Sequence, residues 1–121
     1  MNKVSKILVF GVAAFHVYVL ILEMFLWTHP IGLETFSMSL EEAQVMKVLA
    51  MNQGLYNGFL AAGLFYSLYR GNVEYQVFFL GCVIAAGVYG GLTAKMSILY
   101  LQALPAIFTL SVVLLNRTKS G

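Results

Sequence analysis

Residues 7–27, ILVFGVAAFHVYVLILEMFLW, decide the fold that this sequence predicts. About 20 consecutive apolar residues form a helix long enough to cross the hydrocarbon core of a bilayer. His16 and Glu23 interrupt the apolar run, and the helical repeat places them on one face, with Trp27 one turn further along. A carboxylate inside a membrane helix costs about 2.5 kcal/mol or more. Glu23 is therefore a candidate functional residue.

The composition is that of an integral membrane protein. Of the 121 residues, 60% are hydrophobic and 10% are charged, whereas about 25% are charged in a typical soluble domain. The formal net charge is +2, with the basic residues mainly at the ends. This pattern is typical of membrane topology and not of a nucleic-acid-binding surface, so no nucleic-acid partner is expected. We expect a single domain, residues 1–121, that crosses the cell membrane several times.

Four apolar stretches predict an all-α fold, a bundle of four transmembrane helices. The expected spans are residues 7–27, 47–69, 74–94 and 98–115. Pro30 ends the first span, because the residue before a proline is pushed out of helical geometry. An amphiphilic loop at the interface is expected over residues 28–38. Pro105 is expected to kink the last helix.

The second helix is predicted to begin outside the bilayer. Ser39 and Glu42 have the spacing of a capping box, so one continuous helix is expected from there to about Tyr69. Four spans place both termini on one side of the membrane. That side then carries five basic residues, which are Lys3, Lys6, Arg70, Arg117 and Lys119. The positive-inside rule therefore predicts that both termini are cytoplasmic.

The predicted spans bring polar side chains to one depth, in the outer half of the bundle. The candidate catalytic residues are Glu23 and His16. The residues expected to line a ligand pocket are Asn52, Gln53, Asn57, Gln102, Tyr56, Tyr89, Thr93 and Trp27. A single buried amide usually only joins neighbouring helices, for about 0.6 kcal/mol on average. The presence of so many polar residues at one depth favours a pocket open to the outside. The alternative is a polar network that only joins the helices of the bundle.

Glu23 and His16 supply the parts needed for acid–base or proton-coupled chemistry. The two side chains could share a proton directly or through water, or could merely satisfy each other. No metal site is predicted, because His29 follows His16 at a spacing that puts them on nearly opposite helix faces. No cofactor motif is recognisable, and the sequence leaves open whether the chain is an enzyme.

Two glycine pairs, Gly54-x-x-x-Gly58 and Gly87-x-x-x-Gly91, let a neighbouring helix approach closely. Packing within the chain is favoured over dimerisation, and the sequence is compatible with a monomer or a homodimer.

The whole chain resembles a family of small bacterial four-span membrane proteins known only as a domain of unknown function. The matching features are His16 with Glu23-Met24 and Trp27, then Asn52-Gln53-Gly54-x-x-Asn57-Gly58, Gly90-Gly91-x-Thr93 and Gln102-x-x-Pro105. The resemblance implies an integral membrane protein and no particular activity. Small multidrug-resistance transporters, and sterol-isomerase-like or DoxX-like bundles, are looser analogies that share no motif residue by residue.

The leading functional expectation is binding of a small amphipathic or lipid-like molecule in the outer pocket. Glu23 would be the proton acceptor or cation partner, His16 its proton partner, and the amides would orient the ligand. The alternatives are a proton-coupled transporter that acts as a dimer, and a structural or accessory membrane subunit. A transporter needs access from both sides, and the sparse polar residues of the inner half count against it.

Overall fold

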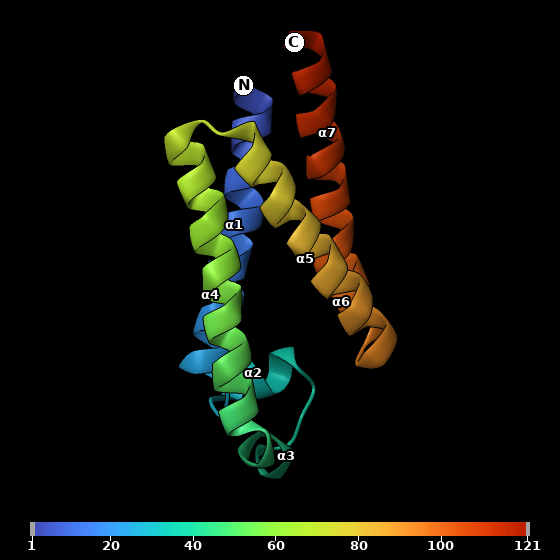
Figure 1. Cartoon of the computed structure of the whole chain (residues 1–121). Helices are drawn as coiled ribbons and strands as arrows, with labels where there is room; N and C mark the ends of the chain where they lie inside the picture. Colours follow the sequence, from blue (N-terminus) through green and yellow to red (C-terminus); the bar gives the residue numbers. More distant parts are fainter. Residues whose placement is uncertain (1, 121) are drawn as a thin grey trace. The chain divides into compact units, whose positions relative to one another are not determined.

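The computed structural model describes residues 2–120, and the side chains of residues 2–117 (Figure 1). Met1 and Gly121, the ends of the predicted domain, lie outside the described residues. Every described element is a helix, which confirms the all-α class. Contacts divide the chain into two compact units: a central unit, residues 14–61, and a terminal unit, residues 1–13 and 62–121.

The first helix, α1 (Lys3–Met24), begins and ends earlier than the predicted span 7–27. At its end, the N–H groups of the next two residues both donate to the Ile21 carbonyl, at 3.0 and 3.1 Å. The second of these bonds reaches back five residues instead of four, so the chain leaves the helical path there. Trp27 therefore lies beyond α1, and its predicted place on the helical face of Glu23 is wrong.

A short helix, α2 (Pro30–Thr35), occupies the predicted loop 28–38. The His29 ring caps it, because Nδ1 accepts a hydrogen bond from the Ile31 N–H at 3.2 Å. Pro30 stands at the first helical position, where its φ is preset for a helix and its missing N–H would have no helical partner. Pro30 thus starts a new helix, whereas the sequence pattern predicted only the end of the previous one.

The segment that follows α1 packs tightly against α2. A Cβ added to the buried Gly32 would meet the backbone carbonyl oxygens of Leu26 and Trp27. The Trp27 ring lies beside that of Phe36, with centroids 4.9 Å apart. Glycine at position 32 therefore permits a contact between backbones that a larger residue would prevent.

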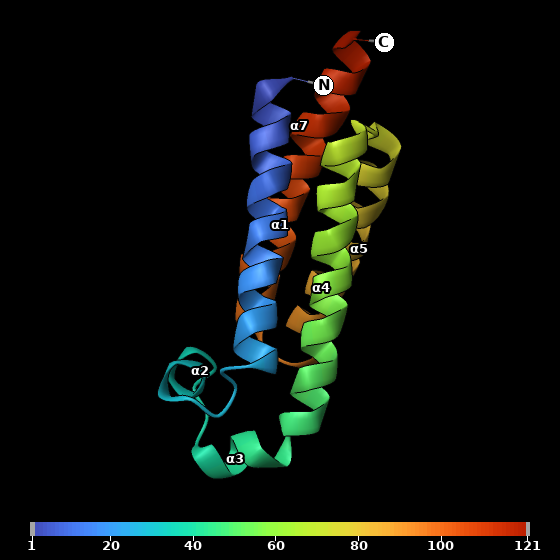
Figure 2. The same cartoon turned by 90° about the vertical axis from the view of Figure 1, so that its left-hand side faces the viewer.

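The helix α3 (Leu40–Val45) begins at the predicted capping box. The Glu42 N–H donates to Ser39 Oγ at 3.1 Å, and the Ser39 N–H donates to Glu42 Oε1 at 3.0 Å. The single continuous helix expected from this point is wrong, because the chain turns at Met46 and α4 (Lys47–Arg70) begins in a new direction (Figure 2).

The indole of Trp27 bonds to the last turn of α3, just before this turn. Its Nε1–H donates to the Ala43 carbonyl at 2.9 Å. In a continuous helix, the same carbonyl would accept the N–H of Lys47, four residues later. The indole therefore competes for the acceptor that the next helical turn would use, at the point where α3 ends as a separate short helix.

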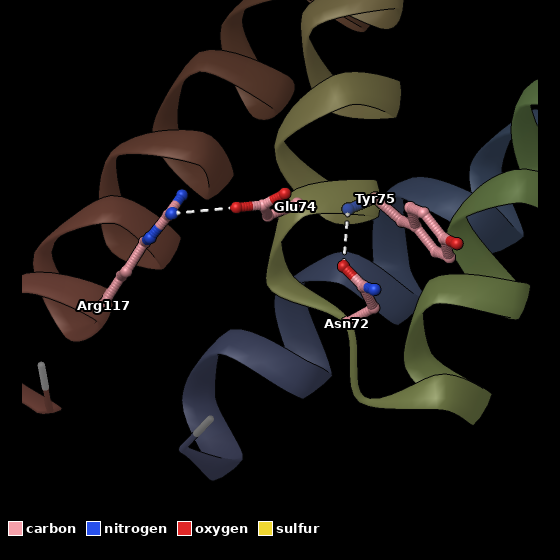
Figure 3. A network of polar contacts seen from close by, with 4 residues as sticks. All are labelled: Asn72, Glu74, Tyr75 and Arg117. Atoms are coloured by element: carbon pink, nitrogen blue, oxygen red, sulfur yellow. Dashed lines mark hydrogen bonds and ion pairs between the residues drawn. The ribbon is translucent and has the colours of Figure 1, made fainter.

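The break predicted between the second and third spans is confirmed as a two-residue turn. Gly71 has a φ of 60°, which side-chain-bearing residues rarely adopt. Asn72 then caps α5 (Val73–Thr93), because its Oδ1 accepts the Tyr75 N–H at 3.1 Å (Figure 3). The helix α5 agrees with the predicted span 74–94, shifted by one residue.

The last apolar stretch is one helical run with a widened turn. The helix α6 (Met96–Ile98) leads into a π-helical turn, η1 (Leu99–Ala103), and then into α7 (Leu104–Ser120). Pro105 has no N–H, so the Leu101 carbonyl lacks the partner that a regular α-helix would give it. The disturbance expected at Pro105 therefore takes the form of a π turn just before the proline.

Two glycines bring α5 close to η1. A Cβ on Gly87 would lie 2.8 Å from the Ala103 backbone nitrogen, and one on Gly91 would lie 2.6 Å from Leu99 Cβ. Both distances are shorter than real contacts allow. The predicted close approach at this glycine pair is thus confirmed, and the neighbour belongs to the same chain.

Three helical stretches are long and apolar enough to cross a membrane: Lys3–Met24, Val73–Thr93 and Met96–Arg117. These stretches indicate a membrane protein, as the composition predicts. The parts of these stretches that belong to the terminal unit, with part of α4, enclose an aliphatic core. This core consists of Val9, Val12, Leu64, Leu80, Val83, Ala103, Ala106 and Val113.

Candidate functional site

The candidate site of the central unit is a polar pair between α1 and α4. Asn57 Nδ2 donates a hydrogen bond to Glu23 Oε1 at 2.6 Å, and it also lies 3.2 Å from the Gln53 carbonyl oxygen of its own helix. Both side chains are half-buried. The carboxyl group of Glu23 is therefore held by a neutral amide from a residue 34 positions later in the chain.

The first glycine pair makes this approach possible. A Cβ on Gly54 would lie 2.5 Å from Met24 Cγ and 3.1 Å from Glu23 Cβ. A Cβ on Gly58 would lie 2.7 Å from Leu20 Cδ1. The predicted role of Gly54 and Gly58 is thus confirmed, and their neighbour is α1 of the same chain.

His16 lies deeper along α1 and is almost fully buried, with 1% of its surface exposed. Its ring meets the Phe15 ring edge to face, with centroids 5.7 Å apart. Seven residues of helical rise, about 10 Å, separate His16 from Glu23 along the axis. A proton would need a carrier to pass between these two side chains, so the direct exchange that the sequence suggested is not favoured.

The other predicted residues of α4 face outward. Asn52 is exposed, and its Nδ2 donates to the Val48 carbonyl of the preceding turn at 2.9 Å. Gln53 is also exposed, and Tyr56 has 53% of its surface exposed. These side chains surround Asn57 along the helix without joining the pair that Asn57 makes with Glu23.

Three predicted pocket residues belong to the terminal unit. Tyr89 is 71% exposed, and its carbonyl accepts a hydrogen bond from Thr93 Oγ1 at 2.7 Å. Gln102 is half-buried in the π turn η1. Of the residues predicted for the site, the structure thus joins Glu23 and Asn57 directly, and the pocket as a whole stays a prediction.

The terminal unit buries polar residues that were not among the predicted site residues. They are Ser5, Ser67, Gln76 and Thr109. Asn116 Nδ2 donates to Ser5 Oγ at 2.6 Å, and Ser67 Oγ donates to the Leu64 carbonyl at 2.5 Å. The apolar repeat could have revealed Gln76, because it precedes Leu80 and Val83 at spacings of four and seven residues, on the buried face of α5.

Within residues 2–117, no three His, Cys, Asp or Glu side chains gather in a group that could hold a metal ion. The chemistry available at the central pair is that of one carboxyl group and one amide. These groups can accept a proton or a hydrogen bond, or bind a cation.

Comparisons with known proteins agree with the resemblance seen in the sequence. Residues 10–114 match the family described as "Protein of unknown function (DUF1304)". The uncharacterized protein YpaA of Lactococcus lactis subsp. lactis (strain IL1403) is 31% identical over 114 residues, which cover 91% of this chain and 96% of that protein. No solved structure matches the chain. The matched region contains the pair formed by Glu23 and Asn57, and the chain belongs to the DUF1304 family of proteins of unknown function.

Proposed function

We propose that this chain is a four-span membrane protein that binds a small amphipathic or lipid-like molecule beside Glu23 and Asn57. The observation that carries the proposal is the hydrogen bond of 2.6 Å from Asn57 Nδ2 to Glu23 Oε1. A carboxyl group at membrane depth is costly and is a functional-site hypothesis by default. A pair that was needed only to join two helices could be formed by two neutral amides at less cost.

The length and charge pattern of α4 support a fourth span. The helix has 24 residues, which corresponds to about 36 Å, and a bilayer core is about 30 Å thick. Residues 48–69 contain no charged side chain, and Lys47 and Arg70 stand at the two ends. The helix is less apolar than the other three stretches because it carries the amides of the proposed site.

The helix α4 also contacts α1 within each unit. In the terminal unit, the Phe65 ring meets the Phe10 ring with centroids 5.5 Å apart. In the central unit, Gly58 packs against Leu20. Because α1 is long and apolar enough to span, a helix that lies beside it in this way is expected to cross the same layer.

We place both termini in the cytoplasm. In the terminal unit, Ser5 near the start of the chain bonds to Asn116 near its end. Arg117 forms an ion pair with Glu74, at the start of α5, with 3.3 Å between Nη2 and Oε1 (Figure 3). The basic residues at this end include Lys3, Lys6, Arg70 and Arg117, and the Lys119 side chain lies outside the described residues. The positive-inside rule then favours cytoplasmic termini, and Glu23, near the end of the first span, is expected in the outer half of the membrane.

The pair favours a ligand with a polar head and an apolar body. The Glu23 carboxyl group offers an acceptor for a hydroxyl or amine, or a partner for a cation, and the Asn57 amide orients it. The exposed Gln53 and Tyr56 lie on α4 within one turn of Asn57 and give further polar contacts. Most of the surrounding surface is apolar, as in ligand sites where a few polar groups fix the orientation.

Native mass spectrometry of the purified protein tests this proposal. Glu23→Gln and Asn57→Ala are the site variants. Glu34→Gln and Gln44→Ala are the matched controls, since both residues are exposed and neither belongs to the predicted site. We expect a co-purified molecule in the wild type and both controls, and its loss from both site variants. Equal occupancy in all five proteins, or no bound molecule in a folded wild type, would overturn the proposal.

A further inference from the structure

We propose that an exposed groove between α1 and α4 of the terminal unit binds an anionic phospholipid. The groove has a volume of about 380 Å³ and is lined by Lys6, Ile7 and Phe10 of α1 and by Leu68 of α4. It lies beside Ser5, which bonds to Asn116 of α7, and none of its residues belongs to the Glu23 site. The inference therefore stands independently of the function proposed above.

The walls of the groove are apolar and open. Ile7 has 60% of its surface exposed and Phe10 has 56%. The Phe10 ring is held edge to face against Phe65 of α4, at an interplanar angle of 71°, so this wall is fixed in place. One turn beyond Ile7, a Cβ on Gly11 would meet no atom within 4 Å. Open surface thus continues along α1 past Ile7, which suits an acyl chain.

Two ammonium groups stand at the terminal end of this surface. Lys3, Lys6, Ile7 and Phe10 follow one another at helical spacings, so they share a face of α1. Glu74 is the only acidic residue in the sequence of the terminal unit, and its carboxylate pairs with Arg117 on α7 (Figure 3). The face therefore presents two positive charges above an apolar groove.

The occupant must match both features. A glycerophospholipid with a net negative head can pair with Lys3 and Lys6 while its acyl chain lies against Ile7, Phe10 and Leu68. Basic side chains at a membrane surface each favour anionic lipid by about a fivefold change in binding, and basic pockets between helices on the cytoplasmic side bind anionic head groups. A zwitterionic lipid fills the groove equally well but gains little from the two lysines.

Lipid exchange followed by native mass spectrometry tests the site. Purified protein in detergent is offered equal amounts of phosphatidylglycerol and phosphatidylcholine, so membrane orientation has no influence. We expect the wild type to retain phosphatidylglycerol in preference. Neutralising both lysines, in Lys3→Gln/Lys6→Gln, is expected to remove most of that preference, because the charged partners of the head group are lost. The control variant Lys47→Gln/Lys95→Gln removes the same amount of charge from other helix ends. It is expected to keep the preference for phosphatidylglycerol.

A second variant tests the groove apart from its charges. Ile7→Trp fills the groove with a larger apolar side chain at a position that is already exposed, so folding should be preserved. We expect it to lower retention of both lipids. Unchanged retention would overturn the groove as the acyl site. The proposal would be overturned if the wild type showed no preference for phosphatidylglycerol, or if both double lysine variants lost that preference equally. Dimers of the chain that carry no lipid would also overturn it, because a second copy would then occupy the groove. Glu23→Gln is expected to retain phosphatidylglycerol, which separates this site from the central pair.

Discussion

At the scale of single residues, Gln76 is the polar side chain that fits its surroundings least well. It is fully buried, and neither Nε2 nor Oε1 has a partner among the described residues. An unsatisfied buried amide costs about 1–3 kcal/mol. Gln76→Met keeps the length of the side chain and removes the need for hydrogen bonds. We expect it to raise the thermal midpoint in detergent by about 4 °C or more, as followed by circular dichroism.

The exposed Gln44 of α3 offers the control for this substitution, because Gln44→Met should leave the midpoint unchanged. A lower midpoint in Gln76→Met would show that the amide has a polar partner and would contradict the interpretation.

Trp27→Phe tests the hydrogen bond that separates α3 from α4. The variant keeps an aromatic ring beside Phe36 but removes the N–H that bonds to the Ala43 carbonyl. The loss of one such bond costs about 1 kcal/mol. We expect amide hydrogen exchange over residues 40–45 to become about fivefold faster, with exchange in α5 unaltered. Unchanged exchange in α3 would mean that the capping box alone holds this helix.

Glu23 and Asn57 show what the sequence could and could not reveal of the site. The cost of an isolated carboxyl group in a membrane predicts that Glu23 has a polar partner, but the partner predicted from the sequence was His16 and not a residue of the second span. The choice of Asn57 over Asn52 depends on the rotation of α4, which Gly54 and Gly58 determine by the way they pack on α1. Periodicity places residues on a helix face, but it does not say which face meets which neighbour.

At the scale of elements, two glycines of α5 stand in opposite environments. A Cβ on Gly87 would press on the Ala103 backbone, whereas one on Gly81 would meet nothing within 4 Å. Gly81→Ala is therefore expected to raise the thermal midpoint, since alanine favours a helix by up to about 1 kcal/mol. Gly87→Ala is expected to lower it by several degrees, because α5 and η1 must move apart. Equal effects of the two substitutions would show that the approach of α5 to η1 is not constrained.

The bounds of the helices were predictable where residues next to the boundary determine it. Gly71 with Asn72 marks the turn before α5, and Ser39 with Glu42 marks the start of α3. The turn at Met46 was not predictable, because the group responsible is the Trp27 indole, 16 residues from Ala43 along the chain. Local propensity cannot register a hydrogen bond made by a distant side chain.

At the scale of the whole molecule, the topology makes a testable prediction. In a Cys82→Ser background, single cysteines are introduced as Asn2→Cys, Glu41→Cys and Glu74→Cys. In sealed right-side-out vesicles, an impermeant maleimide is expected to label only the cysteine at position 41. The four spans and the orientation proposed above would put positions 2 and 74 on the inner side. Labelling at positions 41 and 74 together would show that α4 does not cross. Labelling at positions 2 and 74 without position 41 would show the reverse orientation.

Composition indicated a membrane protein, because so few of the 121 residues are charged, and the length of the apolar stretches predicted that it is helical. Three stretches meet the length and hydropathy of a span, and α4 does not, since Asn52, Gln53 and Asn57 lower its hydropathy. The sequence therefore supports a membrane crossing least directly for α4. The same helix carries Asn57, one of the two residues of the central pair.

Trp27 has one more consequence, because it is the only tryptophan in the chain. All indole fluorescence therefore originates at the junction of α1, α2 and α3, where the ring is bonded to Ala43 and packed beside Phe36. The protein carries its own optical reporter, and no label is needed to follow this junction. A shift in emission wavelength on adding a ligand or changing the lipid would report a change at residue 27 and nowhere else.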